Sequence, residues 1–223
     1  MPFRVVALPE IVYRVARKGM GDAYARITPE DDRNPKAGGR FDVLGGGVLY
    51  VASQPRTCYL ETLAYLRPSP GIDLKAGHDD SAFLAPGQVP AQWREDRTLY
   101  TLGPREESRL VFVDLADVET RTWLYRLLAD ELAVFGVSHL DVPEVMHPNR
   151  AVSRALARLL YSITDEDGAP MFGGIRYASK YEGTAECWAI FERYPVAVGG
   201  QARIDREDPT FAEAAKSLGL TPF

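Results

Sequence analysis

The sequence predicts an α+β fold with a mixed β-sheet core and flanking helices. Several short runs of valine, isoleucine, leucine and aromatic residues are bounded by glycine, proline or polar clusters, a pattern typical of strands. Two longer segments carry leucines at helical spacing. The predicted strands outnumber the helices and do not alternate regularly with them, which disfavours a doubly wound parallel sheet.

The first half of the chain is expected to hold an extended segment, a polar loop, a buried strand and a helix, at residues 5–15, 17–39, 48–52 and 53–66. Gly45, Gly46 and Gly47 interrupt the chain just before the strand. Ser53 is a candidate N-cap of the helix, and Pro55 falls near its first turn. The strand is therefore expected to lead directly into the helix.

The stretch from residue 67 to residue 104 is punctuated by proline and glycine, and we interpret it as an unassigned insertion or lid. Short strands are expected within it at residues 72–74 and 98–102. The later strands are predicted at residues 110–115, 173–179, 186–192 and 196–198. The later helices are predicted at residues 120–135, 149–161 and 209–218.

The predicted helix at residues 149–161 has an unusual charged face. Arg150, Arg154 and Arg158 are spaced four residues apart, so like charges line up along one stripe opposite the apolar face. Two interpretations stay open at this stage. The stripe is either a solvated helix face or a docking surface for an acidic partner.

Composition limits the class of function. The apolar fraction of 46% and the charged fraction of 26% are ordinary for a soluble globular protein. The net charge of −5 argues against a general nucleic-acid-binding surface. We recognise no secretory signal and no run long enough to span a bilayer, and therefore expect a cytoplasmic protein without membrane association. Cys58 and Cys187 lie in apolar surroundings and are expected to be buried thiols.

Several common catalytic motifs do not occur in the sequence. The three histidines show no metal-ligand spacing, so no metal site is expected. We find no P-loop and no dinucleotide-binding glycine motif after a strand. Ser179 lacks a G-x-S-x-G context, so a hydrolase nucleophile is not supported.

The stretch from Gly38 to Leu66 is the most informative part of the chain. It sets Arg40 in a glycine-rich turn, Tyr50 in an apolar strand and Glu61 in a short helix. A cation, an aromatic plane and an anion from adjacent elements suit a cleft for a flat, phosphorylated substrate. Two structural alternatives remain. Glu61 would then occupy the solvated stripe of its helix, and Tyr50 would be a core aromatic.

Five short motifs, taken in order, resemble the RES-domain family. They are Tyr13-Arg14, GGRF at residues 38–41, LYVA at 49–52, LET at 60–62 and GIRYAS at 174–179. The likeness extends from about residue 10 to about residue 195 and supports a single domain over residues 1–223. It also implies an ADP-ribosyltransferase-like fold.

This resemblance implies a function. Family members are typically toxins of bacterial toxin–antitoxin pairs and consume NAD+; some transfer ADP-ribose to inorganic phosphate, and others modify a protein. We therefore expect an NAD+ phosphorylase with NAD+ as substrate and no metal. The alternatives are an ADP-ribosyltransferase acting on a protein and a non-catalytic nucleotide-binding module. The expected partner is an Xre-type helix-turn-helix antitoxin on a separate chain, and the toxin could form a homo-oligomer.

The resemblance also implies roles for individual residues. Glu61 would stabilise the positive charge that develops on the ribose when the nicotinamide bond breaks. Arg40 and Arg14 are the candidates for binding the pyrophosphate, and either could be the family's defining arginine. Tyr50 would cover the nicotinamide ring. Ser179 would form a hydrogen bond with the nicotinamide or the ribose.

Arg176 is a further candidate for binding NAD+. It alternates with Tyr177 along the strand predicted at residues 173–179, so one of the two is expected to face the cleft. Lys180 and Glu182, which follow this strand, are expected to lie on the surface.

Overall fold

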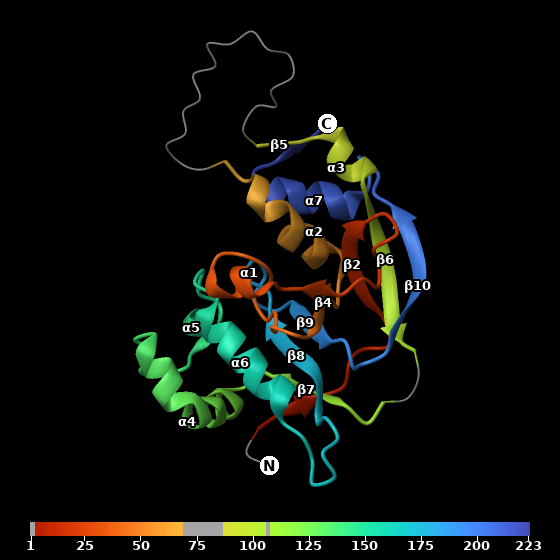
Figure 1. The fold of residues 1–223 in the computed structure, drawn as a ribbon. Helices are drawn as coiled ribbons and strands as arrows, with labels where there is room; N and C mark the ends of the chain where they lie inside the picture. The colour runs from red at the N-terminus through yellow and green to blue at the C-terminus, as the bar shows by residue number, and fades with distance from the viewer. Residues whose placement is uncertain (1–2, 69–86, 106–107) are drawn as a thin grey trace.

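The computed structural model describes residues 3–68, 87–105 and 108–223. Within this part, a mixed nine-stranded sheet forms the centre of the molecule, and helices pack around it, which confirms the α+β class (Figure 1). The strands of this sheet are β1 (Val5–Val6), β2 (Val12–Arg17), β3 (Ala25–Arg26), β4 (Gly47–Ala52), β6 (Arg97–Pro104), β7 (Val111–Asp114), β8 (Phe172–Ala178), β9 (Glu186–Phe191) and β10 (Val196–Arg203).

Seven α-helices are found in the same described residues. They are α1 (Pro29–Arg33), α2 (Pro55–Leu63), α3 (Ala91–Glu95), α4 (Val118–Val134), α5 (Val142–Val145), α6 (Ala151–Ser162) and α7 (Pro209–Ser217). A 3-10 turn, Ala64–Leu66, extends α2. A separate small sheet joins β5 (Gln88–Val89) in parallel to β11 (Thr221–Pro222).

The strand order in the large sheet is β1-β7-β8-β9-β4-β2-β6-β10, and β3 pairs with β4 off this path. Neighbouring strands are antiparallel except β7 and β8, which are parallel. The connection between these two parallel strands contains α4, α5 and α6. A crossover of this kind is what a parallel pair requires.

The sheet nearly divides between β2 and β4. Only Tyr13 and Ala52 pair across this boundary, whereas β2 forms six pairs with β6, and β4 forms five with β9. Helices α2 and α7 accompany β2, β6 and β10, while α4, α5 and α6 lie beside β7 and β8 (Figure 1). The fold therefore consists of two half-sheets, each with its own helices, which meet at one bridge.

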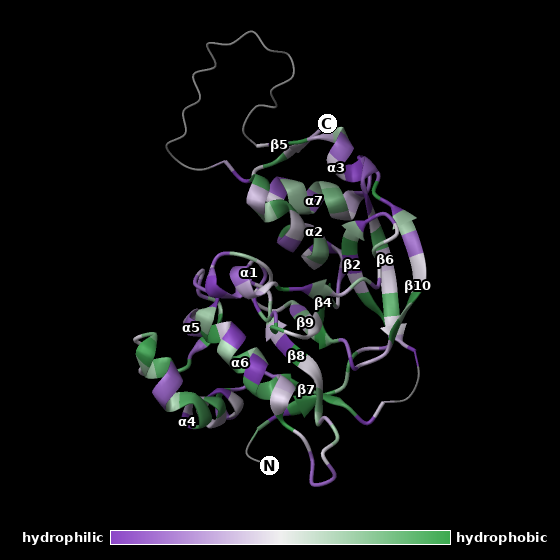
Figure 2. Cartoon of the chain, in the orientation of Figure 1, coloured by the Kyte–Doolittle hydropathy of each residue, from purple (hydrophilic) through white to green (hydrophobic). Residues whose placement is uncertain are grey.

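Apolar side chains form the core between these layers. Helix α6 buries Val152, Leu156, Ala157 and Leu160 in the cluster that also holds Phe172 of β8. Figure 2 shows β7 and much of β2 as hydrophobic, whereas the short helix α1 is hydrophilic. The predicted amphipathic character of α6 is confirmed on its apolar face.

The arginine stripe on α6 differs from both interpretations of the sequence. Arg154 is 1% exposed, and its guanidinium donates hydrogen bonds to main-chain carbonyls of α1 and of the segment that follows it. Arg150 donates to the carbonyls of residues 36–38, and Arg158 forms an ion pair with Glu131. The stripe is neither a solvated face nor an open docking surface, because residues 31–38 pack over Arg150 and Arg154, and Glu131 pairs with Arg158.

Two local predictions need correction. The expected loop at residues 17–39 contains β3 and α1, and α1 begins where the Thr28 hydroxyl accepts a hydrogen bond from the amide of Asp31. The N-cap of α2 is Gln54 rather than Ser53, whose hydroxyl donates to the Glu186 carbonyl instead.

The part of residues 67–104 that the structure describes forms regular elements. It contains β5, α3 and β6, and β6 confirms the strand expected at residues 98–102. The strand expected at residues 72–74 lies outside the described residues. The strand expected at residues 196–198 is longer than predicted, because β10 pairs along the whole of β6.

Gly174 in β8 gives a test of this packing. A Cβ atom at Gly174 would lie 2.1 Å from the Ala189 carbonyl oxygen and 2.7 Å from the Phe112 ring, and the residue has a φ of +156°. We expect Gly174→Ala to lower the free energy of unfolding by about 1–3 kcal/mol or more. The reason is that the paired Ala189 backbone and the buried Phe112 ring would both have to move to make room for the methyl group. Urea denaturation followed by circular dichroism measures the change.

The matched control is Gly183→Ala, since a Cβ there would meet no atom within 4 Å. That variant should unfold at nearly the wild-type urea concentration. Equal stability of the two variants would contradict the packing described for β8 and β9.

Candidate functional site

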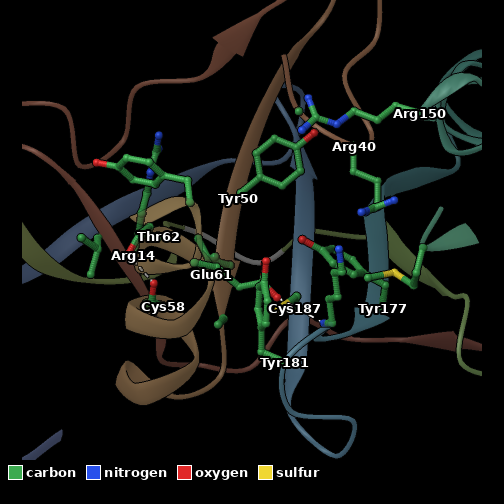
Figure 3. Close-up of a pocket in the computed structure, with 18 of the residues that line it drawn as sticks. Arg14, Arg40, Tyr50, Cys58, Glu61, Thr62, Arg150, Tyr177, Tyr181 and Cys187 are labelled. Atoms are coloured by element: carbon green, nitrogen blue, oxygen red, sulfur yellow. Dashed lines mark hydrogen bonds between the residues drawn. The ribbon is translucent and has the colours of Figure 1, made fainter. Parts of the chain in front are cut away.

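A cavity of about 690 Å³ opens where the two half-sheets separate (Figure 3). Its walls come from β2, β4 and α2, from the loop before Arg40, from the loop between α5 and α6, and from the end of β8 with the residues that follow. Sites for small molecules commonly have volumes of roughly 300–1,000 Å³. This main cavity is therefore large enough for a substrate of nucleotide type.

The charges of the main cavity are strongly unbalanced. Among its described lining residues, five side chains are cationic and Glu61 is the one carboxylate; the cations are Arg14, Lys36, Arg40, Arg150 and Lys180. The whole chain has a net charge of −5, so the positive character is local. Such a concentration of cations attracts an anionic ligand.

Glu61 enters the cavity from α2 and is held from the opposite side. Its Oε1 accepts a hydrogen bond of 2.7 Å from the Ser179 hydroxyl and one of 3.3 Å from the Lys180 amide. Ser179 is 4% exposed, and its oxygen accepts a hydrogen bond from the Tyr181 amide at 3.2 Å. Because Tyr181 orients the Ser179 hydroxyl, the carboxylate is fixed although its side chain remains accessible. Glu61 thus faces the cavity and not an outer helix stripe.

Tyr50 connects β4 to the glycine-rich turn. Its hydroxyl donates to Asp42 Oδ1 at 2.7 Å and accepts from the Phe41 amide at 2.9 Å. Burial, with the neighbouring Asp42 carboxylate, holds the pKa of Tyr50 well above its usual value, so the phenol stays protonated. A Cβ at Gly39 would lie 2.4 Å from this hydroxyl, which explains the glycine.

Arg40 and Arg14 line opposite parts of the cavity (Figure 3). Arg40 Nη1 donates to the carbonyls of Val145 and His147 at 3.1 and 2.8 Å. Arg14 Nη1 donates to the carbonyls of residues 21 and 23 at 3.2 and 2.8 Å. Burial lowers the pKa of both guanidinium groups, but arginine remains charged at neutral pH.

Strand β8 turns Tyr177, and not Arg176, toward the cavity. Tyr177 lines it together with Tyr50, Tyr65 and Tyr181, and burial raises the pKa of Tyr177 well above its usual value. Arg176 pairs instead with Asp114 at 2.8 Å and with Glu186. The structure therefore does not bring Arg176 to the other predicted residues.

Ser179 does not line the main cavity. It lines a second cavity of about 420 Å³, which shares Met146, Tyr177 and Lys180 with the first. Most of its other lining residues are apolar, among them Leu115, Val142 and Val145. Lys180 was expected on the surface, and its side chain is exposed, but it lies at the junction of the two cavities.

Sequence reasoning missed several residues of the site. Asp42 directly follows the GGRF motif and binds Tyr50, so its position beside the motif was a usable signal. Lys36, Arg150 and Tyr181 reach the cavity through tertiary packing and leave no such signal.

The described residues contain no group of three or more histidine, cysteine or acidic side chains arranged to hold a metal ion. A search of the same residues finds no helix of sufficient length and hydrophobicity to span a membrane.

Comparison with protein families gives one match. The model of the RES domain matches residues 11–212. The chain belongs to the RES-domain family. Among solved structures, a chain in the crystal structure of the M. tuberculosis MbcT–MbcA toxin–antitoxin complex is similar to this RES domain, with 12% sequence identity and a TM-score of 0.49 over 96% of this chain and 91% of that one. No curated protein matches.

Both cysteines of the RES domain are buried free thiols, as expected, and both line the main cavity. Burial raises the pKa of Cys58 to about 12 and also raises the pKa of Cys187. A thiol that stays protonated is a poor nucleophile. We expect neither cysteine to react with a disulfide reagent at pH 8 in the folded protein, and both to react after denaturation.

The same shift predicts a pH dependence of stability. In the unfolded chain the thiols lose protons near pH 9, whereas the folded chain retains them to higher pH. The free energy of unfolding should therefore fall as the pH rises above 9. Rapid labelling of folded protein at pH 8 would contradict the assignment of both thiols as buried and protonated.

Proposed function

We propose that this RES domain is the toxin of a toxin–antitoxin system and that it degrades NAD+. It would cleave the bond between nicotinamide and ribose and transfer ADP-ribose to inorganic phosphate. One observation carries the proposal. A single fixed carboxylate, Glu61, faces a nucleotide-sized cavity whose other charged lining residues are cationic and which four tyrosines also line.

Glu61 suits the bond-breaking step. When the carbon–nitrogen bond breaks, its electron pair moves to the nicotinamide nitrogen, and positive charge develops on the ribose carbon. A carboxylate held in place beside that carbon stabilises the charge without reorganising. The hydrogen bonds from Ser179 and Lys180 supply this fixed orientation, since they hold one carboxylate oxygen and leave the other without a partner among the described residues.

Arg14 and Arg40 suit the pyrophosphate. In the described residues each uses only Nη1 to bind carbonyls, so Nε and Nη2 remain for an anionic ligand. Arginine offers paired donors that match phosphate oxygens. The tyrosines of the cavity offer flat surfaces for the adenine and nicotinamide rings.

Phosphate suits the cavity as an acceptor. Nicotinamide leaves as a neutral molecule, so no acid is required to protonate it. A phosphate oxygen then forms the new bond to the ribose carbon, and phosphate is already anionic at neutral pH, so no strong base is required. Phosphate does need a cation. Lys180, whose main-chain amide binds Glu61, lines the cavity and would supply one.

Glu61→Gln tests this chemistry. We expect it to lower kcat/KM for NAD+ roughly 100- to 1,000-fold, because the amide cannot balance the developing charge. Purified protein is incubated with NAD+, with and without inorganic phosphate, and the products are identified by mass spectrometry. Phosphate-dependent release of nicotinamide together with phosphorylated ADP-ribose is the expected result.

The control is Glu213→Gln, which changes an exposed glutamate on α7 that does not line the cavity. It should keep wild-type activity, and both variants should melt like the wild type. Release without phosphate would indicate hydrolysis or transfer to a protein. Binding of ADP-ribose without any loss of NAD+ would indicate a non-catalytic nucleotide-binding module.

An enzyme that removes NAD+ halts redox metabolism, so the proposed toxin requires a restraining partner. The resemblance to RES toxins points to an Xre-type helix-turn-helix antitoxin on a separate chain. We expect expression of the wild type in a bacterial host to arrest growth and Glu61→Gln to relieve the arrest. Co-expression of the helix-turn-helix protein encoded beside the toxin gene should restore growth and copurify with the chain; growth arrest by both forms would contradict the proposal.

A further inference from the structure

Arg154 is a buried cation that binds main-chain carbonyls and pairs with no carboxylate in the part of the chain that the structure describes. It lies in the first turn of α6 and is 1% exposed. Its Nη1 donates to the carbonyls of Asp31, Asp32 and Asn34 at 3.2, 3.1 and 3.1 Å, and its Nη2 donates to the carbonyl of Ala37. The first two of these acceptors belong to the end of α1, and the other two belong to the segment that follows it.

A buried guanidinium is costly, and an apolar side chain of similar size would usually suit a core position at least as well. Two residues near Arg154 at the start of α6 bind the same part of the chain. Arg150 donates to the carbonyls of residues 36–38, and the Ser153 hydroxyl donates to the Arg40 carbonyl at 2.8 Å. Three residues of one helical turn thus bind the segment that ends at Arg40.

The segment from residue 34 to residue 40, which we call the Arg40 loop, forms one wall of the main cavity. It carries Lys36, Gly39 and Arg40, which all line the cavity. Apart from the bond between Ala37 and Asn34, its main chain forms few hydrogen bonds of its own. Its position therefore depends on donors from α6 and on Asp42.

We infer that Arg154 is a positioning residue that fixes the Arg40 loop, and with it the cationic wall, opposite Glu61. It does not line the cavity, so a ligand bound there would not contact it. Glu61 belongs to a different element, α2, and is held by Ser179. Loss of Arg154 should therefore impair binding of the anionic part of the substrate more than bond cleavage.

The test compares Arg154→Lys and Arg154→Met with the same two changes at Arg158. Arg158 lies one turn further along α6, is partly exposed and pairs with Glu131 rather than with the loop. For Arg154→Met we expect KM for NAD+ to rise by tenfold or more, up to about a hundredfold, with a smaller change in kcat. Arg154→Lys should restore part of the affinity, since an ammonium group reaches fewer of the four carbonyls. The Arg158 variants should stay within about twofold of the wild type.

A purely structural role would give a different result. It would reduce the fraction of folded enzyme, which lowers the apparent kcat and leaves KM unchanged. Variants of Arg154 that fold and retain the wild-type KM would overturn the inference.

The kinetic test rests on the proposed function, so a second measurement does not use turnover. Amide hydrogen exchange, read by mass spectrometry, should show faster exchange at residues 34–40 in the Arg154 variants and unchanged exchange in β4. If the wild type does not consume NAD+ but the Arg154 variants show this faster exchange, the proposed function would be wrong and the positioning role of Arg154 would still be supported. Exchange at residues 34–40 that is the same in variants and wild type would overturn the positioning role.

If neither Arg154 variant folds, amide hydrogen exchange of the wild-type protein tests the inference instead. Ala37 and Gly39 amides both donate hydrogen bonds in the folded chain, to the Asn34 carbonyl and to Asp42. A loop clamped to α6 should exchange these two amides as slowly as the helix itself. Rapid exchange there, with α6 protected, would contradict the inference.

Discussion

The near-division of the sheet between β2 and β4 is the constraint on which the site depends. Only one residue pair joins the two strands, and the main cavity occupies the opening beyond it, between Arg14 on β2 and Tyr50 on β4. Helix α2 follows β4 almost immediately and packs against β2, so it spans the division. Cys58 on this helix donates to the Tyr13 carbonyl at 3.0 Å and thereby ties the helix to the second half-sheet.

This arrangement explains why residues far apart in the sequence meet at the cavity. Glu61 comes from the helix across the division and Ser179 from the end of β8, and the two residues are 118 positions apart in the sequence. Neither half-sheet could form the pair alone. The hydrogen bond that fixes the carboxylate is therefore also a contact between the two halves, so the geometry of the site and the docking of the halves are coupled.

Sequence patterns predicted the parts of the site that local chemistry determines. A glycine cluster, an apolar run and a proline predicted the β4–α2 unit, and with it the neighbourhood of Arg40, Tyr50 and Glu61. The rest depended on long-range packing. Arginines spaced four apart look the same whether water or a distant loop covers them, so the burial of Arg154 could not be predicted. Alternation along β8 showed that Arg176 and Tyr177 differ in direction, but only the neighbouring Asp114 and Glu186 decide which of them faces away.

The partners of the arginines explain how an acidic protein maintains a positive cavity. Arg14, Arg40 and Arg150 bind main-chain carbonyls, which fix a guanidinium through dipoles and leave its net charge in place. By contrast Arg56, Arg158 and Arg176 lie outside the main cavity and pair with carboxylates, which cancel their charge. A carboxylate partner at the cavity would have to be displaced before an anion could bind. Carbonyl partners avoid this competition. Because they do not cancel the charge of the guanidinium groups, a bound phosphate neutralises that charge without displacing a carboxylate.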